Sequence, residues 1–230
     1  IHSAVYREAG ANAVQQLAYT LAHITEYANI NPKMPFTVQW TVSGNYFFEI
    51  AKIRALRWLF ASLADKLKNP HPLHILARPE LRNKTLYDYN VNLLRTTTEC
   101  MSAAIGGADA IANLPYDAFF MKDNAFSRRL ARNQLLLIKE ESYLYGIQNP
   151  ADGCYYIENL TRQLAEKALA LFKQTEKDGG LLAQLKKGII QDKIELYPFV
   201  KKRPEKTIIK PLIARRLAEE TEKNRLENED

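Results

Sequence analysis

The sequence predicts an α/β fold in which helices connect parallel strands. Short runs of β-branched and aromatic residues alternate along the chain with longer segments whose apolar residues recur every three or four positions. That alternation is typical of βα units built around a parallel sheet. With 47% hydrophobic and 25% charged residues, the 230-residue chain also has the composition of a globular protein with a sizeable core.

The first predicted elements are a helix, a strand and a second helix. Residues 11–27 carry apolar side chains at helical spacing. Residues 36–42 form a short β-branched and aromatic run that ends at a Ser-Gly pair, which is typical of a buried strand. Residues 46–67 carry an apolar stripe and stop before an Asn-Pro pair, so we expect a long amphipathic helix there.

This pattern repeats twice more before the strand signals end. The further predicted elements are a strand at 73–77, a polar loop at 78–84, a helix at 85–104, a strand at 110–114 and a helix at 126–142. Three such units are too few to close a barrel on their own.

The C-terminal part is predicted to be helical and then charged. Two helices, at 157–177 and 181–194, flank an Asp-Gly-Gly breaker. Residues 197–230 are charge-rich and broken by proline, so we expect a linker with one short helix at 213–224.

These elements divide the chain into three predicted parts. They are a βα domain at 1–145, a helical extension at 146–196 that packs on it, and the linker at 197–230 leading toward a missing C-terminal domain. Because the chain opens on Ile1 and both ends look internal, we expect it to be a fragment.

Composition and charge limit the possible functions. No apolar run approaches the roughly 18 residues that span a bilayer and no secretory leader is present, so we expect a cytoplasmic protein without a membrane partner. Cys100 and Cys154 lie in different segments, which suggests neither a disulfide nor a zinc site. A net charge of +6 allows an anionic partner, either nucleic acid, a membrane face or a phosphorylated ligand such as coenzyme A.

The common catalytic and metal-binding motifs are absent from the sequence. It contains no GxSxG, no GxGxxG and no Walker loop. His71 and His74 flank a proline but have no carboxylates or cysteines nearby, so we predict no metal site. His23 falls among apolar residues of a predicted helix, and we interpret it as a packing residue.

Two basic clusters are possible phosphate or RNA contacts. The Lys-Lys-Arg run at 201–203 lies in the proline-broken linker, where a solubilising surface is the commoner role. Arg128, Arg129 and Arg132 fall in the first turns of a predicted helix, whose free N–H groups favour anions. Ion pairing is an equally plausible role for these three arginines.

Five segments in order resemble the substrate barrel of cobalamin-dependent acyl-CoA mutases, above all the methylmalonyl-CoA mutase family. The resemblance covers most of residues 4–194, and the five motifs together are specific although none is decisive alone. They are Glu-Ala-Gly-Ala at 8–11 with the helix through Tyr27, Asn-Tyr-Phe-Phe-Glu-Ile-Ala-Lys-Ile-Arg-Ala at 45–55, Arg-Thr-Thr-Thr-Glu-Cys-Met-Ser-Ala-Ala at 95–104, Arg-Leu-Ala-Arg-Asn-Gln at 129–134 with Glu-Glu-Ser at 140–142, and Asn-Pro-Ala-Asp-Gly-Cys-Tyr-Tyr at 149–156.

The resemblance implies the C-terminal part of a (β/α)8 TIM barrel followed by linker helices. In that family the barrel interior admits the pantetheine arm of an acyl-CoA. Adenosylcobalamin sits above it, and homolysis of its cobalt–carbon bond starts a radical carbon-skeleton rearrangement between methylmalonyl-CoA and succinyl-CoA. Such a site must exclude water and hydrogen donors that would quench the radicals.

Several positions depart from the catalytic members of the family. The family histidine that touches the substrate thioester aligns with Val5, and Leu76 begins the stretch that replaces a polar His-Ser-Gln-Thr-Ser-Gly-Trp loop. A His-Thr-Asn motif begins here with Ala112, and a family glutamate corresponds to Ala118. A barrel keeps its chemistry at the strand ends, so no catalytic residue is predicted here.

These departures indicate a retained scaffold with a discarded site, as in the small subunit of heterodimeric methylmalonyl-CoA mutases. A large catalytic subunit would then be the partner and would bind the adenosylcobalamin. Acyl-CoA binding by this chain stays open, with Arg78, Arg82 and Asn113 as weak candidates for substrate contacts.

Two alternatives remain. The chain is a competent mutase for a related acyl-CoA if His2 or His74 replaces the family histidine. It is a basic nucleic-acid-binding module if its charge is functional, a reading that the family-like helices do not favour.

Overall fold

The computed structural model describes residues 1–195 of the chain. The predicted linker at 197–230, with its short helix at 213–224 and its basic run at 201–203, lies outside the described residues.

A parallel sheet forms the centre of the described part. Its strands follow the order β1 (Thr37–Val42), β2 (His74–Pro79) and β3 (Ala110–Ile111), so each strand lies beside the one that precedes it in the sequence. The first residues of the chain extend this order, because His2 forms a parallel bridge with Gln39 of β1. Four consecutive segments therefore run side by side in one direction.

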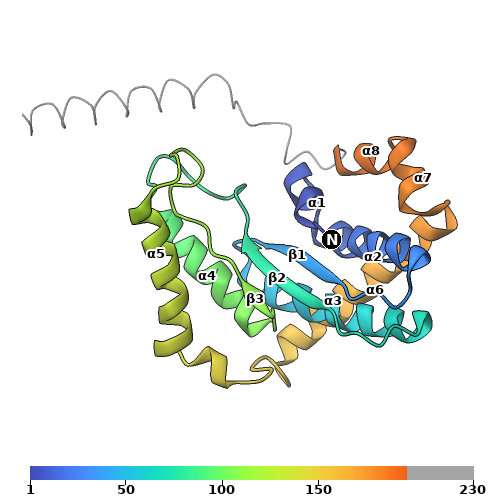
Figure 1. The fold of residues 1–230 in the computed structure, drawn as a ribbon, viewed down its shortest axis with the longest axis horizontal. Helices are drawn as coiled ribbons and strands as arrows, with labels where there is room; N and C mark the ends of the chain where they lie inside the picture. The colour runs from blue at the N-terminus through green and yellow to red at the C-terminus, as the bar shows by residue number, and fades with distance from the viewer. Residues whose placement is uncertain (196–230) are drawn as a thin grey trace, which may run out of the picture. The chain divides into compact units, whose positions relative to one another are not determined.

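Helices connect the strands, and the helices from α1 to α5 pack on one another in sequence order (Figure 1). The helices are α1 (Ala4–Ala9), α2 (Ala13–Ile30), α3 (Tyr46–Leu67), α4 (Val91–Ile105), α5 (Ala125–Leu136), α6 (Tyr155–Lys177), α7 (Gly180–Lys186) and α8 (Ile189–Glu195), with a π turn η1 (Leu137–Glu141) and a 3-10 turn η2 (Leu144–Gly146) after α5. The longest helix, α6, packs across α2 and α3, and α7 and α8 continue from it toward α2. The predicted α/β class with a parallel sheet is confirmed.

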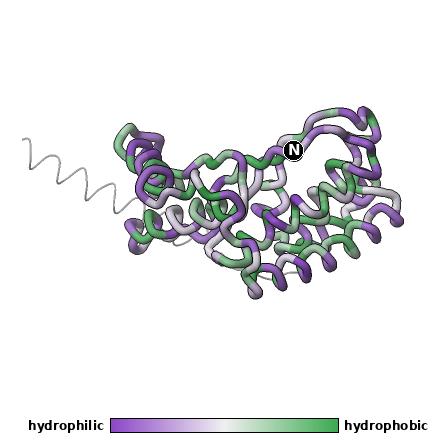
Figure 2. Tube along the Cα trace, turned by 90° about the horizontal axis from the view of Figure 1, so that it is seen from below, coloured by the Kyte–Doolittle hydropathy of each residue, from purple (hydrophilic) through white to green (hydrophobic). Residues whose placement is uncertain are grey.

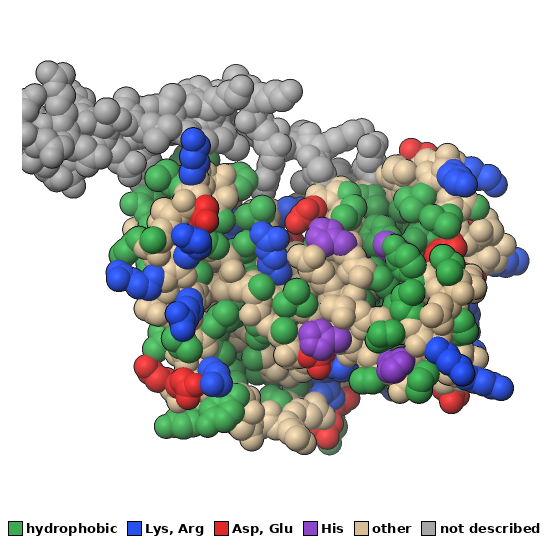
Figure 3. Space-filling view, in the orientation of Figure 1, with side chains coloured by type: hydrophobic (Ala, Val, Ile, Leu, Met, Phe, Trp, Pro, Cys, Tyr) green, Lys and Arg blue, Asp and Glu red, His purple; other side chains and the backbone are tan. Residues whose placement is uncertain are grey.

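The two faces of the sheet differ in burial. One set of alternating strand residues is fully buried against the helices, consisting of Val38, Trp40, Val42, Ile75 and Ala77. The residues between them on β1 and β2 are mostly exposed or half-buried, namely Thr37, Gln39, His74, Leu76 and Arg78. Thr41, the remaining β1 residue of this set, is buried. In the described part of the chain this second face is therefore largely open, and Figure 3 shows separate histidine side chains on the visible surface of the molecule.

Local hydrogen bonds explain where the elements differ from the predictions. The predicted helix 85–104 begins only at Val91, because the Asn92 side chain bonds the backbone of Thr85 and holds the preceding residues as turns. The predicted strand 110–114 stops at Ile111, and the Asn113 side chain accepts the backbone N–H of Leu114.

Two helical differences remain. The six-residue helix α1 has too few apolar positions for a periodic signal, and the sequence did not predict it. The predicted helix 181–194 is two helices that break near Gly188, whose φ of 76° lies in the left-handed region. Figure 2 shows hydrophobic and hydrophilic residues alternating along the helical turns, as the periodicity indicated.

The C-terminal helices have a small core of their own. Leu181, Ile190 and Ile194 pack with Tyr6 and Tyr19, which anchors α7 and α8 on α1 and α2. Among residues 1–195, no helix is both long and apolar enough to cross a bilayer. The three-part division and the barrel stay predictions.

Candidate functional site

The carboxyl ends of the strands form the candidate site, because functional groups of parallel α/β folds collect there. The strands end at Val42, Pro79 and Ile111, and the backbone N–H of Glu80 still bonds the Val42 carbonyl oxygen at 2.8 Å. The residues that follow β1 and β2, Ser43 and Glu80, are both buried and polar. This edge therefore holds buried polar groups that need partners.

The first group of partners lies beneath the end of β1. The Ser43 hydroxyl donates to Glu49 Oε1 at 2.6 Å, and Lys52 Nζ lies 2.6 Å from Glu49 Oε2. Lys52 also donates to the Thr41 carbonyl oxygen at 3.4 Å and sits 5.3 Å from the centre of the Trp40 ring. Burial lowers the pKa of Lys52, and the facing Glu49 carboxylate opposes this shift.

A second ion pair fixes α1 against the end of β2. Arg7 Nε lies 2.9 Å from Glu80 Oε2, and only 5% of the Glu80 side chain is exposed. Arg82 Nη1 donates to the Arg7 carbonyl oxygen at 2.9 Å. The candidate residue Arg82 therefore holds a helix in place by this bond to the protein backbone.

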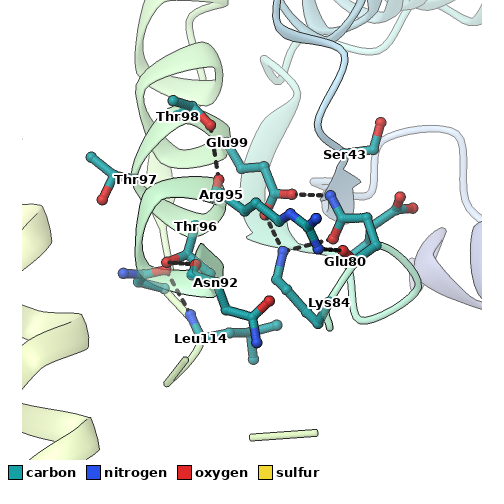
Figure 4. Close-up of polar contacts among 12 residues, drawn as sticks. Ser43, Glu80, Lys84, Asn92, Arg95, Thr96, Thr97, Thr98, Glu99 and Leu114 are labelled. Atoms are coloured by element: carbon teal, nitrogen blue, oxygen red, sulfur yellow. Dashed lines mark hydrogen bonds and ion pairs between the residues drawn. The ribbon is translucent and has the colours of Figure 1, made fainter. Parts of the chain in front are cut away.

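The third group joins the loop after β2 to α4 (Figure 4). Lys84 Nζ lies 2.7 Å from Glu99 Oε2, with 3% and 0% of the two side chains exposed. Asn83 also donates to Glu99, and Arg95 donates to the Asn83 carbonyl oxygen. Burial lowers the pKa of Lys84 and raises the pKa of Glu99, while each charge favours ionisation of the other.

Asn113 belongs to a different contact. Its amide donates to the Ala131 carbonyl oxygen at 3.1 Å and to Gln134 Oε1 at 2.9 Å, both in α5. Gln134 continues this contact to α4 by donating to Leu93 O and Thr97 Oγ1, each at 2.7 Å. Asn113 therefore ties the end of β3 to α5, and the structure does not bring it together with Arg82.

The positions that the family resemblance aligns with catalytic residues, Val5, Leu76, Ala112 and Ala118, carry apolar side chains. Val5 lies on α1 with 55% of its surface exposed. Ala112 and Ala118 are exposed, and their N–H groups bond the carbonyl oxygens of Ala77 and Pro115. Leu76 lies inside β2, as it does in the predicted strand 73–77, and is in register with Gln39 and Ala110.

Arg78 is the one sequence candidate on the open face of the sheet. It lies opposite Thr41 of β1 and is half-buried. Neither an ion pair nor a hydrogen bond of its side chain is found within residues 1–195. Of the three candidates, only Arg78 keeps a guanidinium that the described residues leave uncommitted.

The buried charged groups were not predicted from the sequence. Glu49 and Lys52 stand three residues apart within an apolar helix, and Glu99 interrupts a run of small polar residues. A charged residue on a buried helix stripe was the available signal. No group of three or more potential metal-ligating side chains occurs among residues 1–195.

Residues 1–204 match the family model described as methylmalonyl-CoA mutase. The methylmalonyl-CoA mutase small subunit of Porphyromonas gingivalis is 41% identical over 198 residues, covering 80% of this chain and 32% of that relative. The small subunit of Streptomyces virginiae is 36% identical over 202 residues, covering 82% and 32%.

The chain is also similar to proteins named methylmalonyl-CoA mutase without a subunit designation. The human mitochondrial methylmalonyl-CoA mutase is 33% identical over 204 residues, covering 82% of this chain and 27% of that relative. The chain thus spans about a third of the length of the curated relatives that it matches.

Proposed function

The chain belongs to the methylmalonyl-CoA mutase family, and from this premise we propose that it forms part of a small, non-catalytic mutase subunit. Its large partner subunit would interconvert methylmalonyl-CoA and succinyl-CoA with adenosylcobalamin. The two relatives named as small subunits, at 41% and 36% identity, support this choice over a catalytic chain.

The observation that carries the proposal is the pairing of the buried charges at the carboxyl ends of the strands. The charged groups buried there, Glu49, Glu80 and Glu99, are each bonded to a cation of the same chain. Substrate could engage them only if these pairs broke, which leaves buried charges unpaired at a cost of several kcal/mol. The buried charged groups at this edge of the sheet thus stabilise the fold and do not bind substrate.

The proposed fold is the C-terminal part of a TIM barrel. The consecutive order of β1, β2 and β3, with His2 bridging beyond β1, matches a barrel better than a doubly wound sheet, whose strand order reverses. Under this proposal residues 1–145 belong to the barrel, 146–196 are the helical extension and 197–230 lead onward.

We assign the cofactor to the partner. Adenosylcobalamin supplies the radical chemistry when it is bound. In support of this assignment, the buried charged groups of the carboxyl edge are engaged with one another within the described residues.

The alternative of a competent mutase depends on a replacement histidine. His74 begins β2, and so lies at the opposite end of the strand from the carboxyl edge. His2 pairs with Gln39 near the middle of β1. Neither histidine occupies the end of a strand where a barrel holds its catalytic groups.

A turnover experiment tests the proposal. We expect the full-length protein carrying this sequence to show no mutase turnover alone with methylmalonyl-CoA and adenosylcobalamin. Mixed with the large subunit of the same organism, it should form a stable complex on gel filtration, and the mixture should turn over substrate. Turnover by the lone protein would refute the non-catalytic assignment.

A further inference from the structure

A carboxylate of α2 holds the helix α7 in place. Glu26 Oε1 accepts the backbone N–H of Leu182 at 3.0 Å, in the first turn of α7. A Cβ atom added at Gly180 would lie 3.0 Å from the same oxygen, so the glycine lets the carboxylate approach the helix. Glu26 therefore satisfies one of the free N–H groups at the start of α7, which packs on α2 and α6 (Figure 1).

A second carboxylate lies close to this bond, at the end of α6. Glu176 is half-buried, and its Oε1 atom is buried without a hydrogen-bond partner among residues 1–195. Neither Glu176 nor Glu26 forms an ion pair within that part of the chain. An ionised carboxylate that is buried and unpaired costs free energy, and a second negative charge nearby adds to the cost.

Helix α7 covers the end of α6 that carries Glu176. Gln184 Nε2 of α7 donates to the Thr175 carbonyl oxygen at 2.8 Å, and both residues are buried. Release of α7 would therefore expose Glu176 to water. Because its Oε1 atom is already buried among the described helices, the environment of this atom does not depend on what covers the outside of the fold.

Burial and the neighbouring negative charge both raise the pKa of Glu176. Burial is the larger cause, and among the described residues of α2, α3 and α7 the charge comes from Glu26. The nearby lysines, Lys173 and Lys177 of α6 and Lys186 of α7, are exposed. Since the pKa is higher when α7 is docked, protonation strengthens docking. This stabilisation is complete below the ordinary glutamate pKa of roughly 4.3 and is lost as the pH rises through the higher pKa of the docked state.

His23, one turn before Glu26, responds to pH in the opposite sense. Its Nδ1 atom lies 3.0 Å from the Tyr6 hydroxyl, which joins α2 to α1. Burial lowers the pKa of His23, and the Glu26 charge opposes that shift. Stability from this contact is present at neutral pH and is lost on acidification, so it would loosen α1 where protonation of Glu176 tightens α7. The direction of a pH effect therefore distinguishes the two groups.

We propose that α7 and α8 form a pH-sensitive latch, in which a proton on Glu176, beside the bond from Glu26 to α7, fastens these helices to α2 and α6. Acidification closes the latch, and neutral pH loosens it. Leu181 of α7 and Ile190 and Ile194 of α8 share one apolar cluster, so the two helices respond together. The latch is a property of these helices and is independent of the subunit assignment.

Hydrogen exchange of the full-length protein, measured by mass spectrometry, tests the latch. Protection factors of the amides of residues 180–195, corrected for the intrinsic effect of pH, are compared at about pH 7.5 and about pH 5. We expect wild-type protection to be at least about threefold higher at the acidic pH, since each unit of pKa shift allows up to about tenfold. Glu176→Gln mimics the protonated side chain and should show the higher protection at both pH values.

The control variant is Glu166→Gln, at an exposed position of the same helix, and it should behave like the wild type. Glu26→Gln should reduce the pH dependence without abolishing it, because burial still raises the pKa of Glu176. Unchanged protection of β1 and β2 across the variants excludes a global loss of stability. A Glu176→Gln variant that keeps the wild-type pH dependence, or a wild-type protein without one, would overturn the proposal. Protection that falls on acidification and is restored by His23→Asn would assign the pH response to His23 instead.

Discussion

At the scale of single residues, the main feature is the pairing of charges in the interior. Lys52, Lys84, Glu49 and Glu99 all have side chains that are at most 3% exposed. Buried charges are tolerated only when they are paired and hydrogen-bonded, and both pairs receive a further hydrogen bond, from Ser43 or from Asn83. These residues therefore fix the loops at the carboxyl edge, and replacing one member of a pair should affect stability.

Lys84→Met tests this role. The substitution leaves the Glu99 carboxylate buried without its cation, and we expect the free energy of unfolding to fall by about 3–5 kcal/mol in urea denaturation. The double variant Lys84→Met/Glu99→Leu removes both charges and should recover most of this loss. A double variant as unstable as the single one would show that packing, and not the unpaired charge, governs this site.

At the scale of elements, the contact between α3 and α4 depends on a glycine. A Cβ atom added at Gly106 would lie 3.0 Å from the Ser102 carbonyl oxygen and 3.2 Å from the Ile50 carbonyl oxygen. Both neighbours are backbone atoms of helices, which do not move aside easily. The closeness of the two helices at this point therefore requires the absence of a side chain.

Gly106→Ala should accordingly separate the end of α4 from α3. We expect it to destabilise the protein by about 1–3 kcal/mol, measured by thermal unfolding, because overpacked contacts force backbone shifts. Gly146→Ala is the control, since a Cβ there meets no atom within 4 Å and the residue has no positive φ. The control should be neutral or slightly stabilising, and equal losses in both variants would contradict the packing argument.

Periodicity in the sequence predicted most of these elements, but it could not predict the polar network. The helices α2, α3 and α6 have apolar stripes long enough to be recognised, and their boundaries were right within about three residues. The late start of α4 and the early end of β3 depend on the side chains of Asn92 and Asn113, whose bonding partners are specified only in three dimensions.

In the candidate site too, some features could be predicted from the sequence and others depend on contacts that only the structure shows. The resemblance to the family predicts positions where catalytic groups are replaced, and this stays a prediction. It did not indicate that Arg82 bonds the backbone of α1, nor that Lys84 and Glu99 meet in the interior. Such contacts join residues that are up to 75 positions apart in the sequence.

At the scale of the molecule, the buried side chains are concentrated in one part of the fold. The large core joins β1, β2, α2, α3 and α6, whereas α5 buries only Ser127 and Ala131. Most residues from 136 to 150, which cover η1 and η2, are exposed. A segment with so few buried contacts cannot share the stability of the core.

Hydrogen exchange measured by mass spectrometry should reveal this gradient. We expect the backbone amides of β1, β2 and α3 to exchange slowest, because they open only with the whole core, and the amides of residues 137–150 to exchange fastest within 1–195. Exchange at residues 137–150 as slow as that of β1 and β2 would contradict this gradient and show that few buried contacts do not weaken this segment.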